Sequence, residues 1–217
     1  MRGGFRAVVA SGIGESRIVL RNVSWETFEA LLAETDRAGT RFTYDEGVLE
    51  IMSPSMTHER MKKLLARMIE TMTLELQIPI ASAGNSTLKN QLKQKGVEPD
   101  ECYYVANEPR VRGKIEIDLD DDPMPDLAIE IDISSSSLDQ LRIYAALGIP
   151  EVWLCDGETI RVYQLGAEER YLQVDRSPSF PFLPVDRLQG FLDRVHTADE
   201  TSWIRSFQAW VKSELMP

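Results

Sequence analysis

The chain contains few of the residues on which disulfide frameworks and zinc sites depend. Two cysteines and two histidines occur among its 217 residues, too few for a disulfide scaffold or a zinc centre. We expect Cys102 and Cys155 to be small core residues in a reducing compartment. No apolar run approaches the length of a membrane span, and residues 7–10 are too short for the apolar part of a signal peptide. The sequence therefore predicts a cytoplasmic protein with no membrane association.

Basic residues are also in short supply. The chain has 24 Lys and Arg against 35 Asp and Glu, which gives a formal net charge of −11. Because Lys and Arg contacts to phosphates supply most non-specific affinity, this balance argues against a general nucleic-acid binder. The charge is uneven, however: residues 115–132 include acids but no Lys or Arg. Basic residues that flank this run could form a rim around an acidic centre, or could be ordinary solvated side chains.

Length and composition predict one main domain with short additions. With 43% hydrophobic residues, the chain can bury a normal core. We expect an N-terminal arm over residues 1–20, either a loose segment or an edge strand, and a main domain over residues 21–195. Residues 196–217 carry aromatic and aliphatic side chains at helical spacing. They predict an amphipathic helix that packs on the domain or on a dimer partner.

Periodicity and turn signals predict an alternation of helices and strands. Ser24 precedes a short helix, and residues 45–47 read as the turn of a hairpin. Ser53 and Pro54 are expected to begin a helix of about five turns that stops before Pro79. Strands are predicted at residues 80–83, 97–105 and 127–133. A helix capped within residues 134–137 then ends at Gly148, and a further hairpin turns at residues 156–157.

The strand predicted at residues 127–133 is the most informative part of the chain. Its sequence with the two preceding residues, PDLAIEIDI over 125–133, places aliphatic side chains on one face and carboxylates on the other. The carboxylates are Asp126, Glu130 and Asp132. Close like charges need a neutralising partner, and a divalent cation is the usual one where no Lys or Arg lies on the strand. The alternative is an acidic face that simply points into water.

The ordered set of motifs resembles the Uma family of restriction-endonuclease-like proteins, a branch of the PD-(D/E)XK fold. The resemblance covers roughly residues 41–165 and includes His58. It is carried by LEIMSPS (49–55), EPDE (98–101), PDLAIEI (125–131) and IYAALGIPEVW (143–153). It implies an α/β restriction-endonuclease-like fold, in which a central mixed sheet is flanked by helices.

The same resemblance implies a metal site and a substrate. Asp100 and Glu130 would be metal ligands and catalytic residues, with Asp126 and Asp132 as further ligands or neighbours. Mg²⁺ or Mn²⁺ would activate water for attack on a DNA phosphodiester. His58 and Glu59 could line the cleft, although a structural His and a solvated Glu are the commoner outcomes. A homodimer would follow the habit of this fold.

One departure from the pattern concerns the lysine of the fold. Its usual position, two residues after Glu130, is occupied by Asp132. In the Uma branch the lysine lies on the next helix, and the matching position is Gln140, which can donate a hydrogen bond but carries no charge. Either the metal acts unaided, or a lysine such as Lys89 or Lys114 reaches in, or the site is impaired.

Three functional interpretations remain open from the sequence. The first is a Mg²⁺-dependent DNA endonuclease. The second is a binding or regulatory protein that kept the nuclease fold and lost the active-site lysine at Gln140. The third is a protein that shares the fold alone, with its carboxylates in solvent. The substrate is open among DNA, RNA and a small phosphorylated ligand.

Overall fold

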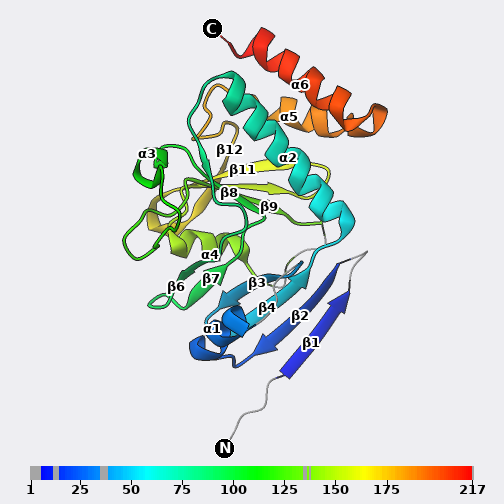
Figure 1. The fold of residues 1–217 in the computed structure, drawn as a ribbon. Helices are drawn as coiled ribbons and strands as arrows, with labels where there is room; N and C mark the ends of the chain where they lie inside the picture. Colours follow the sequence, from blue (N-terminus) through cyan, green and yellow to red (C-terminus); the bar gives the residue numbers. More distant parts are fainter. Residues whose placement is uncertain (1–5, 12–14, 35–38, 134–135, 137, 217) are drawn as a thin grey trace, which may run out of the picture.

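The strands form two six-stranded sheets with helices packed against them (Figure 1). The computed structural model describes residues 6–11, 15–34, 39–133, 136 and 138–216. The second sheet is the central mixed sheet, flanked by helices, that the sequence predicted. The first sheet is a separate sheet that the sequence did not predict. Within the described residues, no helix is both long and apolar enough to cross a membrane.

The first sheet is antiparallel throughout, in the order β1-β2-β4-β3-β7-β6. Its β3–β4 hairpin turns at Glu46 and Gly47, which both have positive φ, as the predicted turn requires. The arm predicted over residues 1–20 includes most of β2, which is a paired strand of this sheet. Its strands are β1 (Arg6–Ser11), β2 (Ser16–Arg21), β3 (Arg41–Asp45), β4 (Val48–Ser53), β6 (Leu88–Asn90) and β7 (Lys95–Val97).

The second sheet is mixed, in the order β12-β11-β10-β9-β8-β5. Its parallel pair, β9 and β10, is joined through helix α4 (Gln140–Leu147), the crossover that a parallel pair needs. The hairpin predicted around Asp156 and Gly157 joins β10 to β11. Its strands are β5 (Ala81–Ser82), β8 (Glu101–Tyr104), β9 (Leu127–Ile131), β10 (Glu151–Cys155), β11 (Ile160–Leu165) and β12 (Tyr171–Val174).

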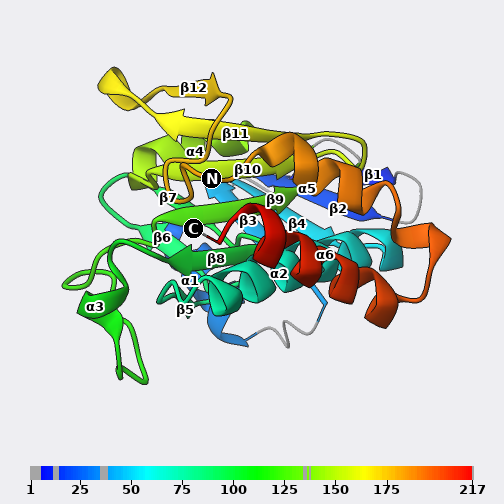
Figure 2. The same ribbon diagram turned by 90° about the horizontal axis from the view of Figure 1, so that it is seen from above.

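Helices cover both faces of the second sheet. Helices α2 and α6 lie side by side across one face (Figures 1 and 2), where they share a core with Leu127, Ile129 and Ile131 of β9. Helix α4 packs on the other face, against Ala128. Besides α4, the helices are α1 (Trp25–Glu34), α2 (Met56–Glu75), α3 (Glu108–Val111), α5 (Val185–Leu192) and α6 (Glu200–Glu214), with 3₁₀ turns η1 (Ala167–Glu169) and η2 (Val195–Thr197).

Two predicted helix starts were wrong. Helix α2 is capped by Ser55, whose hydroxyl accepts the amide of His58, and not by Ser53. Ser53 instead ends β4, because the hairpin extends to that residue. Helix α4 is capped by Asp139. Of the predicted caps at 134–137, all but Ser136 lie outside the described residues.

The strand predicted over residues 97–105 is two strands in different sheets. Pro99 has no amide to donate, and the pairing changes there. Before it, the Glu98 amide donates to Phe42 of β3; after it, the Asp100 amide donates to Ile129 of β9. The chain therefore crosses from the first sheet to the second at Pro99, and Asp100 lies at the crossing.

The C-terminal helix has its partner within the chain. Trp203, Phe207 and Val211 are buried on one face of α6 and belong to the core that contains α2. Helix α6 therefore packs on the chain's own domain, which is one of the two surfaces predicted for it.

Candidate active site

Asp100 and Glu130 face each other on neighbouring strands. The register pairs Glu101 with Ile129, so the preceding residue, Asp100, lies opposite Glu130. The Ile131 amide donates to Asp100 Oδ2 at 2.8 Å. Asp100 is 1% exposed and Glu130 is 4% exposed. Both carboxylates are therefore buried, and the interpretation of Glu130 as part of a solvated surface is wrong.

Glu130 is held by a tyrosine from the helix that follows its strand. The Tyr144 hydroxyl on α4 donates to Glu130 Oε1, and Tyr144 is fully buried. Burial raises the pKa of Glu130 well above its ordinary value, and the negative charge of Asp100 raises it further. The ion of Glu130 is thus disfavoured unless positive charge comes close.

His58 joins two buried carboxylates. Its Nε2 lies 2.8 Å from Asp100 Oδ1, and its Nδ1 lies 2.9 Å from Glu15 Oε1. Burial alone would lower the pKa of His58, but the hydrogen bonds and charges of Asp100 and Glu15 outweigh it and raise that pKa. Because both ring nitrogens already face carboxylates, His58 orients Asp100 and is not available as a metal ligand.

Arg17 on β2 contacts several acids beside Asp100 and Glu130. Its Nη1 donates to Glu50 Oε1 at 2.7 Å, and its Nη2 lies 3.4 Å from Glu15 and 3.8 Å from Asp132. The Ser136 hydroxyl also donates to Glu50. Arg17 is 5% exposed. It therefore brings a buried positive charge near Asp132, the residue at the usual lysine position of the PD-(D/E)XK fold.

Arg41, the first residue of β3, lies on another side of Asp100. Its Nη2 donates to Glu59 Oε1 at 3.1 Å, and its Nε lies 3.7 Å from Asp100 Oδ1. This Nε is buried and makes no hydrogen bond within the described structure. A buried donor in this state commonly faces an ordered water or an anionic oxygen. Glu59, predicted to line the cleft, is 40% exposed at its side chain and belongs to this edge of the site.

Comparison with known proteins identifies the family of this chain and a similar fold. The family model Uma2, described as "Putative restriction endonuclease", matches residues 25–193, more than three quarters of the chain. The chain belongs to the Uma2 family. A similar solved structure from Anabaena variabilis ATCC 29413 is described as "a putative nuclease belonging to DUF820". It has a TM-score of 0.53 and 17% identity, and the match covers 76% of this chain and 97% of that one. No curated protein matches.

The Uma2 family and the solved structure identify a nuclease-like fold. The motif residues Asp100, Glu130 and Tyr144, which the sequence resemblance used, all lie within the matched region. Glu15 and Arg17 lie before it. Sequence reasoning missed both because they fall in the N-terminal stretch, which showed no clear periodic pattern and was interpreted as a loose arm or an edge strand. It quoted Glu50 in a motif but gave it no role, although a Glu between Leu49 and Ile51 on a predicted strand was a usable signal.

Asp126 does not join the other acids in this Uma2 protein. Its carboxylate accepts hydrogen bonds from the amides of Val105 and Asn107, at 2.7 and 2.8 Å, and from the Asn107 side chain. It lies four residues before Glu130, a separation of about 13 Å along an extended strand. The Asp126 carboxylate therefore orders the loop after β8, and the structure does not bring it together with Asp100 and Glu130.

Replacement of Asp126 by Ala should therefore affect stability and not metal binding. The change leaves two partly buried amides without their acceptor, and we expect a loss of about 1–3 kcal/mol in the free energy of unfolding. Urea denaturation measures that loss, and calorimetric titration with Mn²⁺ measures the binding. If the folded variant bound Mn²⁺ more weakly than the parent, that result would show that Asp126 contributes to metal binding.

The lysine of the fold has no direct replacement in the described structure. Gln140 is the half-buried first residue of α4. Lys89 pairs with Glu29 at 2.8 Å, and Lys114 pairs with Asp122 at 2.5 Å. Both lysines that the sequence offered as replacements are therefore paired with other acids in this structure. Arg17, Arg41 and His58 are the positive groups that contact the acids around Asp100. The buried Lys62 of α2 lies 3.8 Å from Glu59 and 3.9 Å from Glu101, the residue after Asp100.

The donor set suits a hard divalent cation held by few protein ligands. In the described part of the chain, no three His, Cys, Asp or Glu side chains converge in a way that could hold a metal ion. Mg²⁺ commonly takes one or two carboxylates and keeps its waters, so the pair Asp100 and Glu130 is sufficient. The buried cluster also has more acids than bases. Its acids are Glu15, Glu50, Asp100, Glu130 and Asp132, and its bases are Arg17, Arg41 and His58.

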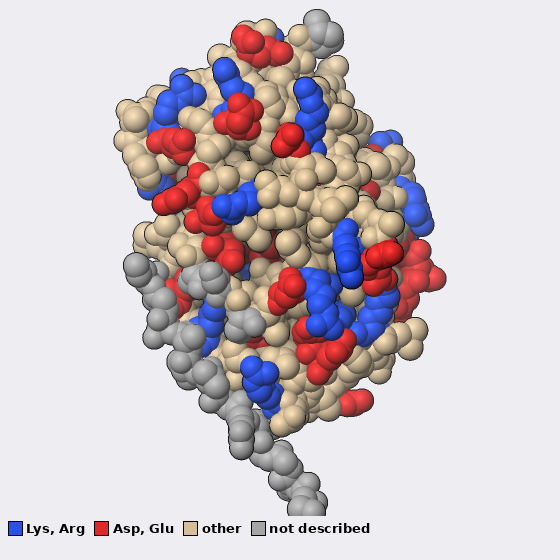
Figure 3. Space-filling model, turned by 180° about the vertical axis from the view of Figure 1, so that it is seen from behind, with Lys and Arg blue, Asp and Glu red and all other residues tan. Residues whose placement is uncertain are grey.

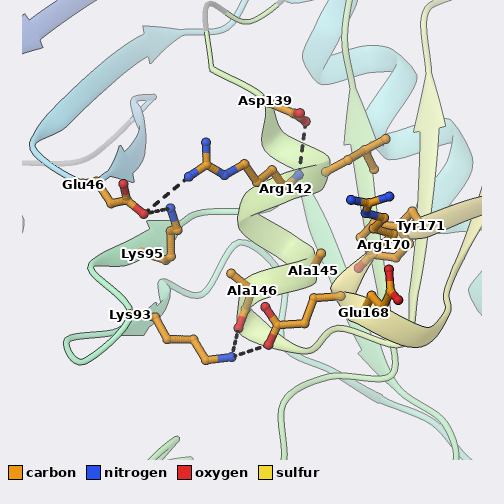
Figure 4. A pocket seen from close by; sticks show the side chains of 12 residues that line it. Glu46, Lys93, Lys95, Asp139, Arg142, Ala145, Ala146, Glu168, Arg170 and Tyr171 are labelled. Carbon is orange, nitrogen blue, oxygen red and sulfur yellow. Dashed lines mark hydrogen bonds and ion pairs between the residues drawn. The ribbon is translucent and has the colours of Figure 1, made fainter.

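The larger cavities lie away from these acids. One of about 730 Å³ lies beside α4 and is lined by Glu46, Arg142 and Arg170, among others (Figure 4). It opens on Leu141 and Ala145, whereas Tyr144 of the same helix points to Glu130. Another, of about 1050 Å³, lies between α1 and residues 116–120. Neither includes Asp100 or Glu130 in its lining.

Proposed function

We propose that this chain is a divalent-metal-dependent endonuclease that hydrolyses DNA phosphodiester bonds. The observation that carries the proposal is the buried pair Asp100 and Glu130, opposite each other in a Uma2-family fold and surrounded by more acidic than basic groups. Both members of such a pair can be ionised only when positive charge lies close, and Mg²⁺ or Mn²⁺ is the class of cation that carboxylate oxygens and water select.

In this proposal Asp100 and Glu130 are the catalytic residues that hold the metal, with Asp132 beside them. When bound, the cation would lower the pKa of a water and stabilise the charge that develops on the phosphate. His58 orients Asp100, and Tyr144 orients Glu130. Arg41 directs its free Nε toward the Asp100 edge, where it can donate to a phosphate oxygen or a water. Arg17 supplies positive charge near Asp132.

The second candidate is a nuclease-fold protein that binds nucleic acid and does not cleave it. The observation that favours it is Gln140, at the position where the resemblance implies a lysine, together with the engagement of Lys89 and Lys114 elsewhere. An amide can hydrogen-bond a water but cannot stabilise an anion as an ammonium does. The two candidates share the metal site and differ only in turnover.

Cleavage of supercoiled and single-stranded DNA, in Mg²⁺ or Mn²⁺ and in excess chelator, tests the proposal. We expect the parent protein to convert supercoiled DNA to nicked or linear forms only when the metal is present. The Gln140→Lys variant separates the two candidates. An inert parent with an active Gln140→Lys variant would establish the second candidate, and inactivity of both in either metal would contradict the endonuclease.

The proposed homodimer and cytoplasmic location stay predictions. Helix α6, which suggested a dimer surface, buries its apolar face within the chain. Light scattering on the purified protein measures the oligomeric state.

A further inference from the structure

A cavity at the C-terminal end differs from the other cavities in its charge. It has a volume of about 400 Å³, lies between α5 and α6, and includes arginines, aromatic rings and hydroxyls but no Asp or Glu in its lining. By contrast, the cavity beside α4 includes Glu46, Asp139, Glu168 and Glu169. On the face shown in Figure 3, acidic and basic side chains are intermixed. In a chain with a net charge of −11, a cationic cavity without acids is a distinct feature.

Two arginines of this cavity lie over aromatic rings. The Cζ atom of Arg187 is 5.7 Å from the centre of the Trp210 ring, and that of Arg194 is 4.7 Å from the centre of the Phe191 ring. Arg194 Nε also donates to the Gly190 carbonyl at 2.9 Å. Within the described structure, neither guanidinium forms an ion pair with a carboxylate. Both side chains are exposed, and cation–π contact with the rings leaves their terminal Nη groups for a ligand.

The rings that form the cavity wall are themselves fixed. Trp203 is buried, and its indole Nε1 donates to the Phe191 carbonyl at 2.8 Å. Phe191 contacts the Trp210 ring, with 5.6 Å between ring centres. Trp210 is only partly buried, so part of its surface remains open. A planar group beside the guanidiniums could contact that open part of the ring.

The cavity extends beyond the part of the chain that the family model matches. The match ends at residue 193, so Arg187 and Phe191 lie inside it, whereas Arg194 and the whole of α6 lie outside it. Asp100, Glu130 and the other acids of the candidate active site are absent from its lining. The cavity therefore needs an explanation of its own.

We propose that this cavity binds a phosphate ester next to a nucleobase, with Arg187 and Arg194 on the phosphate and the Trp210 ring on the base. Guanidinium edges match phosphate oxygens in pairs, and stacking on an aromatic ring tolerates any base. Free nucleotides and a nucleic-acid strand carry the same chemical group. The site does not depend on the proposed metal centre and requires no turnover.

Titration of the full-length protein in excess EDTA tests this site without the metal centre. The probes are 5′-AMP, a 5′-phosphorylated hexadeoxyadenylate and adenosine, followed by calorimetry and tryptophan fluorescence. We expect saturable binding of a phosphorylated probe, and binding at least about tenfold weaker in Arg187→Gln/Arg194→Gln, since charged hydrogen bonds to phosphate are among the strongest in proteins. The tighter of the two phosphorylated probes identifies the source of the phosphate.

Arg205→Gln is the matched control, because Arg205 is an exposed arginine of α6 that is absent from the cavity lining. It should bind as the parent does. Thermal unfolding of each variant confirms that its fold is retained. No saturable binding of either phosphorylated probe, equal affinity for adenosine and 5′-AMP, or equal binding by the parent and the double variant would each overturn the proposal. Cleavage assays in Mg²⁺ are scored separately, so the two proposals can fail independently.

Discussion

Glu130→Gln should abolish metal-dependent DNA cleavage while the protein stays folded. The change keeps the shape of the side chain and its contact with the Tyr144 hydroxyl, but removes the negative charge that faces Asp100. Without that charge the site can no longer offer two carboxylates to one cation. We expect cleavage to fall by at least about 10²-fold, the usual effect of losing a group that stabilises transition-state charge. Initial rates of nicking at saturating Mg²⁺ measure the effect.

A buried glutamate on the adjacent strand provides the control. Glu151 of β10 is fully buried and accepts hydrogen bonds from Trp153 Nε1 and the Ser179 amide. Glu151→Gln makes the same chemical change in the same sheet without altering the acids around Asp100. We expect it to cleave at close to the parent rate once its folding is verified. Equal losses in Glu130→Gln and Glu151→Gln would point to general disturbance of the sheet and would contradict a specific role for Glu130.

Arg17→Met should destabilise the fold by about 3–5 kcal/mol, the range observed when one partner of a buried ion pair is removed. Methionine keeps much of the side-chain volume, so the main loss is the positive charge. The carboxylates of Glu50 and Glu15 would then lie buried near Asp132 without the guanidinium that they contact. Urea denaturation, followed by circular dichroism, measures the change in the free energy of unfolding.

Arg21 is the matched control because it lies on the same strand, β2, and is exposed. Arg21→Met should change the free energy of unfolding by no more than about 0.5 kcal/mol, as surface substitutions usually do. Similar losses in the two variants would mean that β2 itself, and not the buried charge, determines the effect. An Arg17→Met variant as stable as the parent would show that these acids are neutral in the folded protein.

Local sequence patterns predicted the strand that carries Glu130, because apolar and acidic residues alternate along β9. The role of Asp100 came from the family resemblance, and local patterns placed this residue within a single strand over residues 97–105, which the structure divides between two sheets. The hairpin turns at Gly47 and Gly157 were predictable for the same reason, since their sequences require positive φ. Where neighbours in the chain decide the conformation, the sequence was sufficient.

The network around Asp100 could not be predicted in this way. His58 and Glu15 are 43 residues apart, and Arg17 and Glu50 are 33 residues apart. Their contacts exist only because β2 pairs with β4, a long-range choice that no local pattern encodes. The hydrogen bonds of Asp126 could not be predicted for a related reason. Its alternation with Glu130 predicted the correct face of the strand, but the amides that donate to its carboxylate come from the loop after β8. The spacing of residues predicted which face of a strand each side chain lies on, but not which groups it contacts.

Binding of Mn²⁺, measured by isothermal titration calorimetry, tests the central claim most directly, because it needs no substrate and no turnover. The parent should bind the metal saturably, and Asp100→Asn and Glu130→Gln should each weaken binding by at least about tenfold, since each removes one of two carboxylate ligands. Unchanged affinity in both variants, or no binding by the parent, would contradict a metal site built on Asp100 and Glu130.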